Sequence, residues 1–201
     1  MESALSLQSS NGGVWNLYTD GVKSNLLRVG SGNTTLNLYG QDVLRNLPRI
    51  SFDENTGSVL RMNVFADNSF STFEFNSKGV IELAIAEGAS LKIEKLTTKN
   101  GVKSTSNAEI VFYDYSANAF LLEDSSLTAE DDKLYIQSVD SYIKLTAYDE
   151  AGNLLVGDWV YDWSEELGVG KLVLNAVPEP EAAAVLLGVL ALALAARRKK
   201  K

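Results

Sequence analysis

Short runs in which apolar and polar residues alternate cover most of this 201-residue chain, between Val14 and Ala176. Side chains two positions apart lie on one face of a strand, so each run predicts a strand with one buried face. Turn residues separate the runs at intervals of roughly 8–12 positions, which is typical of all-β folds. The expected core sets are Leu60, Met62 and Val64; Leu91 and Ile93; Ile110 and Phe112; Ile143 and Leu145; and Leu172 and Leu174.

Two all-β architectures fit this pattern. In a right-handed parallel β-helix, each coil stacks a short strand on the strand of the previous coil. The stretches "GSGNTTLNLYG" and "EGASLKIEKL", each a glycine turn followed by a strand, favour this fold. The L-x-L pairs fall at irregular intervals, at positions 36, 60, 73, 83 and 91, which favours the alternative, an antiparallel β-sandwich. We expect a parallel β-helix over residues 1–176.

The composition excludes several kinds of active site. The chain has no Cys and no His, which excludes disulfides, Cys/His zinc sites and His-based catalytic triads. Residues 1–176 contain 13 Lys and Arg but 24 Asp and Glu, and so acidic a surface is unsuited to nucleic acid. The acidic groups Glu130–Asp132 and Asp158 with Asp162 lack a flanking catalytic motif. We therefore expect a non-enzymatic protein with no cofactor, no metal site and no nucleic-acid partner.

Aromatic residues alternate in the stretch "GDWVYDWSEE". In a strand, Trp159, Tyr161 and Trp163 share one face, with Val160 and Asp162 on the other. Such a row of rings either caps the end of a solenoid core or stacks on sugars. The second possibility makes Trp159 and Trp163 candidate glycan contacts.

Two short stretches predict turns. In "WSEELG" (163–168), Ser164 as the cap and Gly168 as the stop predict a single helical turn. In "DEAGN" (149–153), the spacing of Asp and Gly predicts an Asx-type turn, because the pattern completes no known calcium loop.

The last 25 residues differ in kind from the rest. Residues 182–196 are Ala, Leu, Val and one Gly, with no polar side chain. As a helix they span about 22 Å, and the stems of the following Arg side chains extend this length toward the ~30 Å hydrocarbon core of a bilayer. Five cations follow and favour a cytoplasmic end. The segment predicts one C-terminal transmembrane helix that includes Ala182, Leu187, Gly188 and Ala196.

This order of a Pro-Glu-Pro step, an apolar helix with an internal glycine and a basic end resembles the PEP-CTERM sorting signal of Gram-negative bacteria. The resemblance implies that an exosortase-type membrane peptidase recognises the step and cleaves there, after which the protein reaches the cell surface or the medium. It implies an inner-membrane precursor with a transient anchor over Ala182–Ala196. The recognition residues are then Pro178, Glu179 and Pro180, and the cytoplasmic stop is Arg197, Arg198, Lys199, Lys200 and Lys201.

These observations predict an exported surface or extracellular matrix protein with a role in adhesion or envelope structure. Its body loosely resembles the β-helical passenger repeats of autotransporter-like proteins. One alternative is an exported carbohydrate-binding or polysaccharide-degrading β-helix with surface polysaccharide as its partner, and another is an uncleaved membrane-anchored protein. Because "MESALSLQSSNGG" has no apolar region typical of a signal peptide, we expect residues 1–176 to be the C-terminal part of a longer protein.

Overall fold

The computed structural model describes residues 6–9, 12–19, 24, 26–30, 32–52, 57–76, 78–98 and 108–176. Their strands form two sheets. The first sheet contains, in spatial order, β1 (Ser6–Ser9), β3 (Leu26–Val29), β5 (Arg49–Phe52), β7 (Asn68–Phe75), β9 (Leu91–Thr98), β11 (Phe120–Leu122), β17 (Val169–Ala176) and β16 (Gly157–Ser164). The second contains β12 (Leu127–Glu130), β13 (Lys133–Ile136), β14 (Ser141–Tyr148), β10 (Glu109–Tyr113), β8 (Val80–Ile85), β6 (Ser58–Val64), β4 (Gly32–Leu38) and β2 (Gly13–Leu17), and β15 (Leu154–Leu155) pairs with β14.

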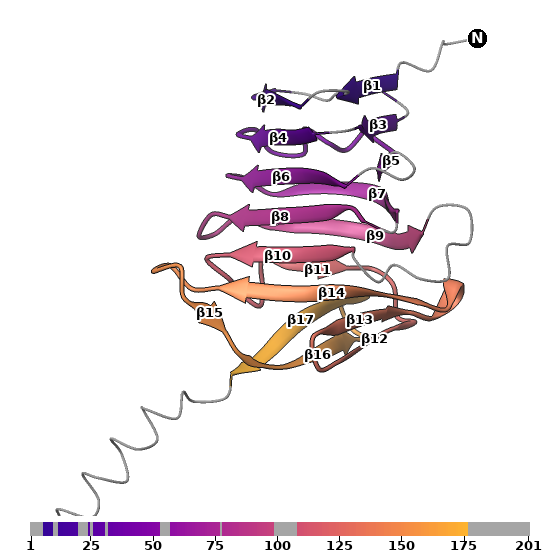
Figure 1. Cartoon of the computed structure of the whole chain (residues 1–201), viewed down its shortest axis with the longest axis vertical. Coiled ribbons are helices and arrows are strands. Elements are labelled where there is room, and N and C mark those ends of the chain that lie inside the picture. The colour runs from indigo at the N-terminus through magenta and orange to yellow at the C-terminus, as the bar shows by residue number, and fades with distance from the viewer. Residues whose placement is uncertain are drawn as a thin grey trace, which may run out of the picture.

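Up to β11 the chain alternates between the two sheets, with odd-numbered strands in the first and even-numbered strands in the second. The pairs β1–β3–β5–β7–β9–β11 and β2–β4–β6–β8–β10–β14 are all parallel. Each coil thus adds one strand to each sheet, and the coils stack along one axis (Figure 1). This β-solenoid confirms the predicted all-β class and the predicted stacking of coils. The alternative of an antiparallel sandwich is wrong for these coils.

The register of the first sheet contains a regular repeat. Leu27 pairs with Ile50, Ile50 with Phe73, and Phe73 with Leu96, so equivalent residues are 23 positions apart. The intervals between L-x-L pairs look irregular in the sequence because they mix the two sheets. Positions 36, 60 and 83 lie in the second sheet, whereas positions 73 and 91 lie in the first.

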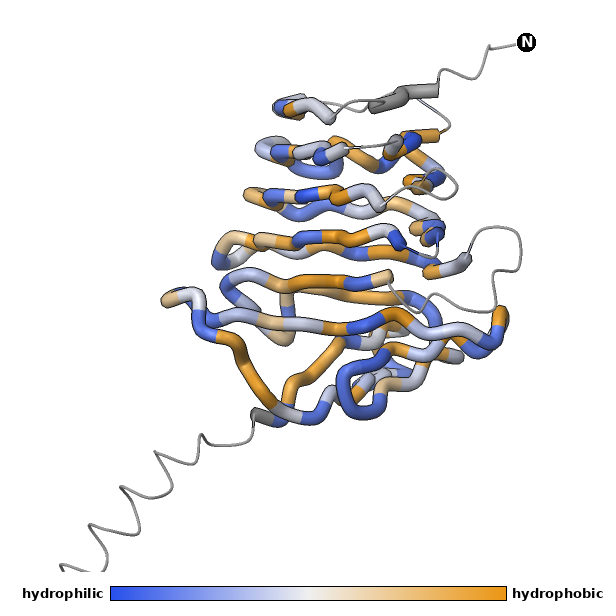
Figure 2. Tube along the Cα trace, in the orientation of Figure 1, coloured by the Kyte–Doolittle hydropathy of each residue, from blue (hydrophilic) through white to orange (hydrophobic). Residues whose placement is uncertain are grey.

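The core lies between the two sheets, and apolar residues alternate with polar ones along the stacked strands (Figure 2). The predicted core sets are buried as expected, and Leu60, Met62 and Val64 are each 0% exposed. Leu174 differs, since it is only partly buried against the core. The ring of Phe73 packs against those of Phe52 and Phe75, with centroids 5.8 Å and 5.0 Å away.

Antiparallel strands close the C-terminal end of the solenoid. Strands β16 and β17 form a hairpin, and β17 pairs antiparallel with β11. Strands β12, β13 and β14 form a second antiparallel group. A 3-10 turn at Gln137–Val139 connects β13 to β14. We call β12, β13, β16 and β17 the cap, because solenoid ends need such a closure to cover their core.

The last described strand ends at Ala176, where the predicted boundary of the body lies. Segment 177–201, with its predicted transmembrane helix and sorting signal, is outside the described residues. Within the described part of the chain, no helix is long and apolar enough to cross a membrane.

Substitution of the central core ring tests the packing. Phe73 is 1% exposed and contacts the rings of Phe52, Phe70 and Phe75. We expect Phe73→Ala to lower the free energy of unfolding by about 3–5 kcal/mol, because it removes buried contacts and leaves a cavity. Urea unfolding followed by circular dichroism measures the change. Val160→Ala, at a 43% exposed position, is the control and should change the free energy by less than about 0.5 kcal/mol.

Candidate functional site

A row of asparagines runs along the outer face of the second sheet. Asn16, Asn37 and Asn63 occupy equivalent positions in successive coils. The side-chain amide of Asn37 donates to Oδ1 of Asn16 over 2.7 Å, and that of Asn63 donates to Oδ1 of Asn37 over 2.7 Å. The next equivalent residue is Ala84, so the row ends there.

A row of exposed aromatic rings lies two residues further along the chain, directly after the ends of the same strands. The rings of Tyr18, Tyr39 and Phe65 stack with centroids 4.7 Å apart and with angles of 6° and 3° between successive planes. These side chains are 63%, 42% and 49% exposed, respectively. Large apolar rings exposed in a row are unusual on a soluble surface and mark a candidate interaction site.

The aromatic row stops at Ala86. The backbone N–H of Tyr39 donates to the carbonyl of Leu17, and that of Phe65 donates to the carbonyl of Leu38. In the same way, the N–H of Ala86 donates to the carbonyl of Val64, the residue before Phe65. Ala86 therefore occupies the fourth place in the row. A methyl group stands where a fourth ring would stack on Phe65.

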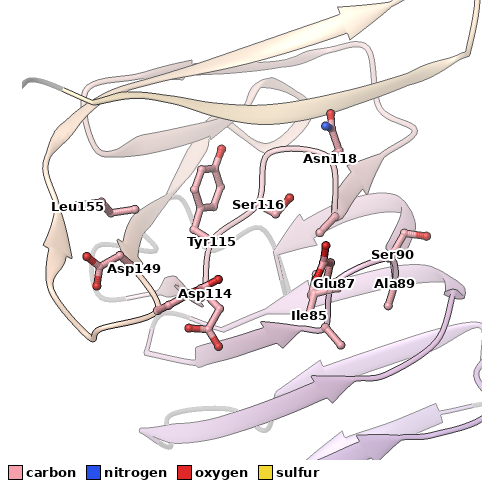
Figure 3. Close-up of a pocket in the computed structure, with 14 residues that line it drawn as sticks. Ile85, Glu87, Ala89, Ser90, Asp114, Tyr115, Ser116, Asn118, Asp149 and Leu155 are labelled. Atoms are coloured by element: carbon pink, nitrogen blue, oxygen red, sulfur yellow. The ribbon is translucent and has the colours of Figure 1, made fainter.

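A cleft of about 910 Å³ begins at this interruption. Its walls come from the turns that follow β8, β10 and β14, as Figure 3 shows. Four carboxylates line it, and none of the described lining residues is cationic. The lining residues that carry polar side chains are Glu87, Ser90, Asp114, Tyr115, Ser116, Asn118, Asp149 and Glu150.

The turn after β8 shapes one wall of the cleft. The N–H of Ala89 donates to the carbonyl of Ala86 over 3.0 Å, and Gly88 between them has a φ of +79°. This conformation suits glycine at the third position of a type II turn. A side chain at Gly88 would meet no atom within 4 Å. At the position that Tyr39 and Phe65 occupy in the preceding coils, this turn has only the methyl group of Ala86.

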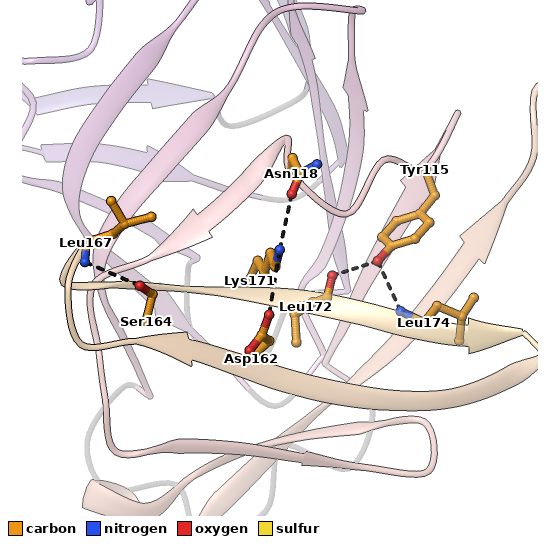
Figure 4. Close-up of polar contacts among 8 residues, drawn as sticks. All are labelled: Tyr115, Asn118, Asp162, Ser164, Leu167, Lys171, Leu172 and Leu174. Carbon is orange, nitrogen blue, oxygen red and sulfur yellow. Dashed lines mark hydrogen bonds and ion pairs between the residues drawn. The ribbon is translucent and has the colours of Figure 1, made fainter.

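Tyr115 lines another part of the cleft and joins the coils to the cap. Asp114 has a φ of +52°, and the aromatic ring of the next residue packs on the core at 5.7 Å from Phe112 and 5.2 Å from Trp159. Its hydroxyl donates to the carbonyl of Leu172 over 2.6 Å and accepts from the N–H of Leu174 over 3.1 Å (Figure 4). Burial raises the pKa of the Tyr115 hydroxyl, so it stays neutral as these bonds require.

The turn 149–153 forms a further wall, and Asp149 closes it as a turn residue, although Asn153, which bonds to its carboxylate, lies four positions on rather than two. The N–H of Asn153 donates to Oδ1 of Asp149 over 2.7 Å, and its side-chain amide donates to Oδ2 over 3.0 Å. These bonds from Asn153 lower the pKa of the Asp149 carboxyl. The Asp149 carboxyl is therefore ionised at neutral pH, and together with the other carboxylates of the lining it gives the cleft a negative potential.

The negative charge of the body is concentrated around the cleft and the cap. Residues 1–107 contain ten Lys and Arg and ten Asp and Glu, whereas residues 108–176 contain 3 Lys and 14 Asp and Glu, a net charge of −11. Among the described residues, no group of three or more Asp and Glu is placed to hold a metal ion. The field around the cleft therefore disfavours anionic ligands.

The two tryptophans predicted as glycan contacts lie in the cap. Strand β16 places Trp159, Tyr161 and Trp163 on one face and Val160 and Asp162 on the other, as predicted. Trp159 is 3% exposed, and its ring packs 5.6 Å from that of Phe112. Glycan contact at Trp159 and Trp163 stays a prediction, and the burial of Trp159 does not favour it.

The predicted helical turn at 163–168 is the loop of the cap hairpin. The N–H of Gly168 donates to the carbonyl of Ser164 over 2.9 Å, and the N–H of Leu167 donates to its hydroxyl over 3.3 Å. Gly168 adopts a φ of +64°. The capping residue and the stop residue therefore act as predicted, within a loop rather than at a helix. Lys171 in the adjoining strand bonds to Asn118 and Asp162 (Figure 4).

The sequence contains a signal for the exposed rows that its alternation pattern does not reveal. The tripeptides Asn-Leu-Tyr at 16–18, Asn-Leu-Tyr at 37–39 and Asn-Val-Phe at 63–65 are the same motif in three coils, and Ala-Ile-Ala at 84–86 replaces it in the fourth. Alignment of every second strand would have identified both rows and their interruption. No family model, curated protein or solved structure matches this chain.

Alkaline pH should loosen the cap. Burial, followed by the charge of Asp124, raises the pKa of the Tyr161 hydroxyl, which donates to the carbonyls of Leu122 and Asp124. A raised folded-state pKa gives stability that is complete below the unfolded value of about 10 and is lost as pH rises above it. We therefore expect the free energy of unfolding to fall above about pH 10, and to fall less steeply in Tyr161→Phe, as measured by urea unfolding at several pH values.

The matched control for this prediction is Tyr18→Phe, which removes the hydroxyl of a ring that is 63% exposed. At neutral pH we expect Tyr161→Phe to cost about 1 kcal/mol through its lost hydrogen bonds. Identical alkaline slopes for wild type and Tyr161→Phe would contradict the assignment.

Proposed function

We propose that the protein is an exported, non-enzymatic surface or extracellular matrix protein that an exosortase-type peptidase sorts through its C-terminal segment. The observation that carries this proposal is the sequence after the last strand. Directly beyond Ala176 come the Pro178-Glu179-Pro180 step, fifteen apolar residues and five cations. An apolar stretch without polar side chains favours a transmembrane helix, and the cations favour a cytoplasmic end.

The fold of the body supports a structural or adhesive role in this proposal. In a solenoid each coil contacts its neighbours, so a rigid body with long lateral faces is built without a catalytic centre. The acidic composition suits solubility outside the cell. The proposal includes a right-handed winding of the coils, which is the preferred hand of parallel crossovers, and a transmembrane helix over residues 182–196.

Two alternatives remain open beside the main proposal. An uncleaved membrane-anchored protein would keep the whole tail, and the mass of the mature chain distinguishes it. A carbohydrate-binding or polysaccharide-degrading protein that uses Trp159 and Trp163 is the other. For that alternative the cap would have to expose Trp159, which is 3% exposed.

Mass spectrometry of the mature C-terminus tests the proposal. We expect cells that contain an exosortase-type peptidase to produce a chain that ends near Pro180, without the apolar segment and the five cations. Cells without the peptidase should retain the full-length chain in the membrane fraction. A step flanked by two prolines has an extended backbone that a protease can bind. We therefore expect Glu179→Ala to reduce processing strongly.

Glu181→Ala is the matched control, because it removes a carboxylate just outside the Pro-Glu-Pro step. It should be processed like the wild type. An intact Arg and Lys tail in cells that contain the peptidase would contradict the proposal and favour the uncleaved alternative.

A further inference from the structure

We propose that the cleft after β8, β10 and β14, together with the outward face of Phe65, binds a neutral or amino-substituted glycan chain. This inference goes beyond the proposed sorting function, because it rests on the folded coils and uses no residue of the C-terminal segment. It also differs from the glycan contact predicted at the cap, which involves other residues on another strand.

The ring of Phe65 has one face on which no other described aromatic ring stacks. Phe65 stacks on Tyr39 through one face, with 4.7 Å between centroids. Its opposite face points along the solenoid axis toward the coil of Ala86, where only a methyl group stands. The side chain of Phe65 is 49% exposed, so part of the ring is accessible to a ligand. The flat C–H face of a pyranose suits it, since the face of an aromatic ring carries negative charge density that attracts C–H groups.

Polar side chains of the cleft lining lie next to that ring face. Phe65 does not line the cleft itself, but Ala86, which follows it in the row, does, so the ring borders the polar lining. The carboxylates of Glu87, Asp114 and Glu150 offer acceptors for sugar hydroxyls, and the side chains of Ser116 and Asn118 offer donors as well. Figure 3 shows Glu87, Asp114 and Asn118 on turns from different coils around one hollow. An apolar platform bordered by a few polar groups is the usual composition of a small-ligand site.

The negative charge of the cleft selects among glycans. Among the described residues, the lining contains four carboxylates and no cation, and the surrounding residues 108–176 carry a net charge of −11. Uronic-acid polymers and other anionic glycans are therefore repelled. Neutral hexoses are tolerated, and sugars with a free amino group gain attraction. The volume of about 910 Å³ accommodates a short stretch of such a chain.

Calorimetric titration of the full-length chain tests the proposal, with the protein held in a detergent that contains no sugar. The three probes are a neutral cello-oligosaccharide, a glucosamine oligomer of the same length and a galacturonate oligomer of the same length. We expect the glucosamine oligomer to bind more tightly than the neutral one, and the galacturonate oligomer not to bind. Added salt should weaken only the binding of the glucosamine oligomer.

Two variants locate the site. Phe65→Ala removes the platform and should weaken binding of both oligomers at least about tenfold. Ala86→Phe extends the aromatic row by one ring and covers the platform, so it should abolish binding while it preserves the fold, as judged by circular dichroism. Tyr18→Ala, at the other end of the row, is the matched control and should leave the affinity within about twofold.

Each other outcome overturns the proposal. If none of the probes binds to the wild type, or if the galacturonate oligomer binds best, the assigned ligand class is wrong. Undiminished binding in a folded Ala86→Phe variant would place the glycan elsewhere. Because processing of the tail is scored separately by mass, a failure here leaves the sorting proposal intact, and the reverse also holds.

Discussion

The parallel register between successive coils is the constraint on which the rest of this structure depends. Backbone hydrogen bonds hold equivalent residues at the inter-strand spacing of about 4.8 Å, so any residue type that recurs at an equivalent position forms a continuous row. Inside the solenoid, Leu27, Ile50, Phe73 and Leu96 form such a row of the core. Outside it, the same register stacks the aromatic rings at 4.7 Å. Core packing and surface pattern therefore have one common cause.

A substitution at one position of such a row interrupts it without a change in the backbone register, and the interruption leaves a hollow on the surface. Where Ala-Ile-Ala replaces the Asn-Leu-Tyr motif, the backbone continues in register, but the side chains that filled the outer corner are missing. In the next coil, Asp114 adopts a left-handed conformation and Tyr115 packs against the core and the cap. The cleft thus results from two local changes in a regular scaffold. Its polar lining comes from turns, whose side chains can vary because they do not form the packed core.

The sequence predicted the strands well because alternation reports burial directly, as Leu60, Met62 and Val64 show. It did not predict the 23-residue repeat of the first sheet. Strands of the two sheets alternate in the chain, so the intervals between successive L-x-L pairs mix both sheets. The row of Tyr18, Tyr39 and Phe65 was missed for a different reason: its rings lie on exposed positions, where alternation predicts polar residues. Trp159 was predicted on the correct face, but the pattern cannot show that the rings of Phe112 and Tyr115 cover it.

The uneven charge of the body bears on the proposed precursor. The coils that carry the net charge of −11 are those nearest Ala176, where the C-terminal segment begins, while the aromatic row lies in coils with no net charge. If residues 182–196 anchor the chain, the acidic end lies next to the bilayer, and any anionic lipid in the leaflet that faces it repels that end over roughly a Debye length of 8 Å at physiological salt. In the proposed precursor, such repulsion would hold the body away from the bilayer and leave the Pro-Glu-Pro step accessible to a membrane peptidase. The acidic end would therefore assist release, while the uncharged coils stay available for contacts at the far end.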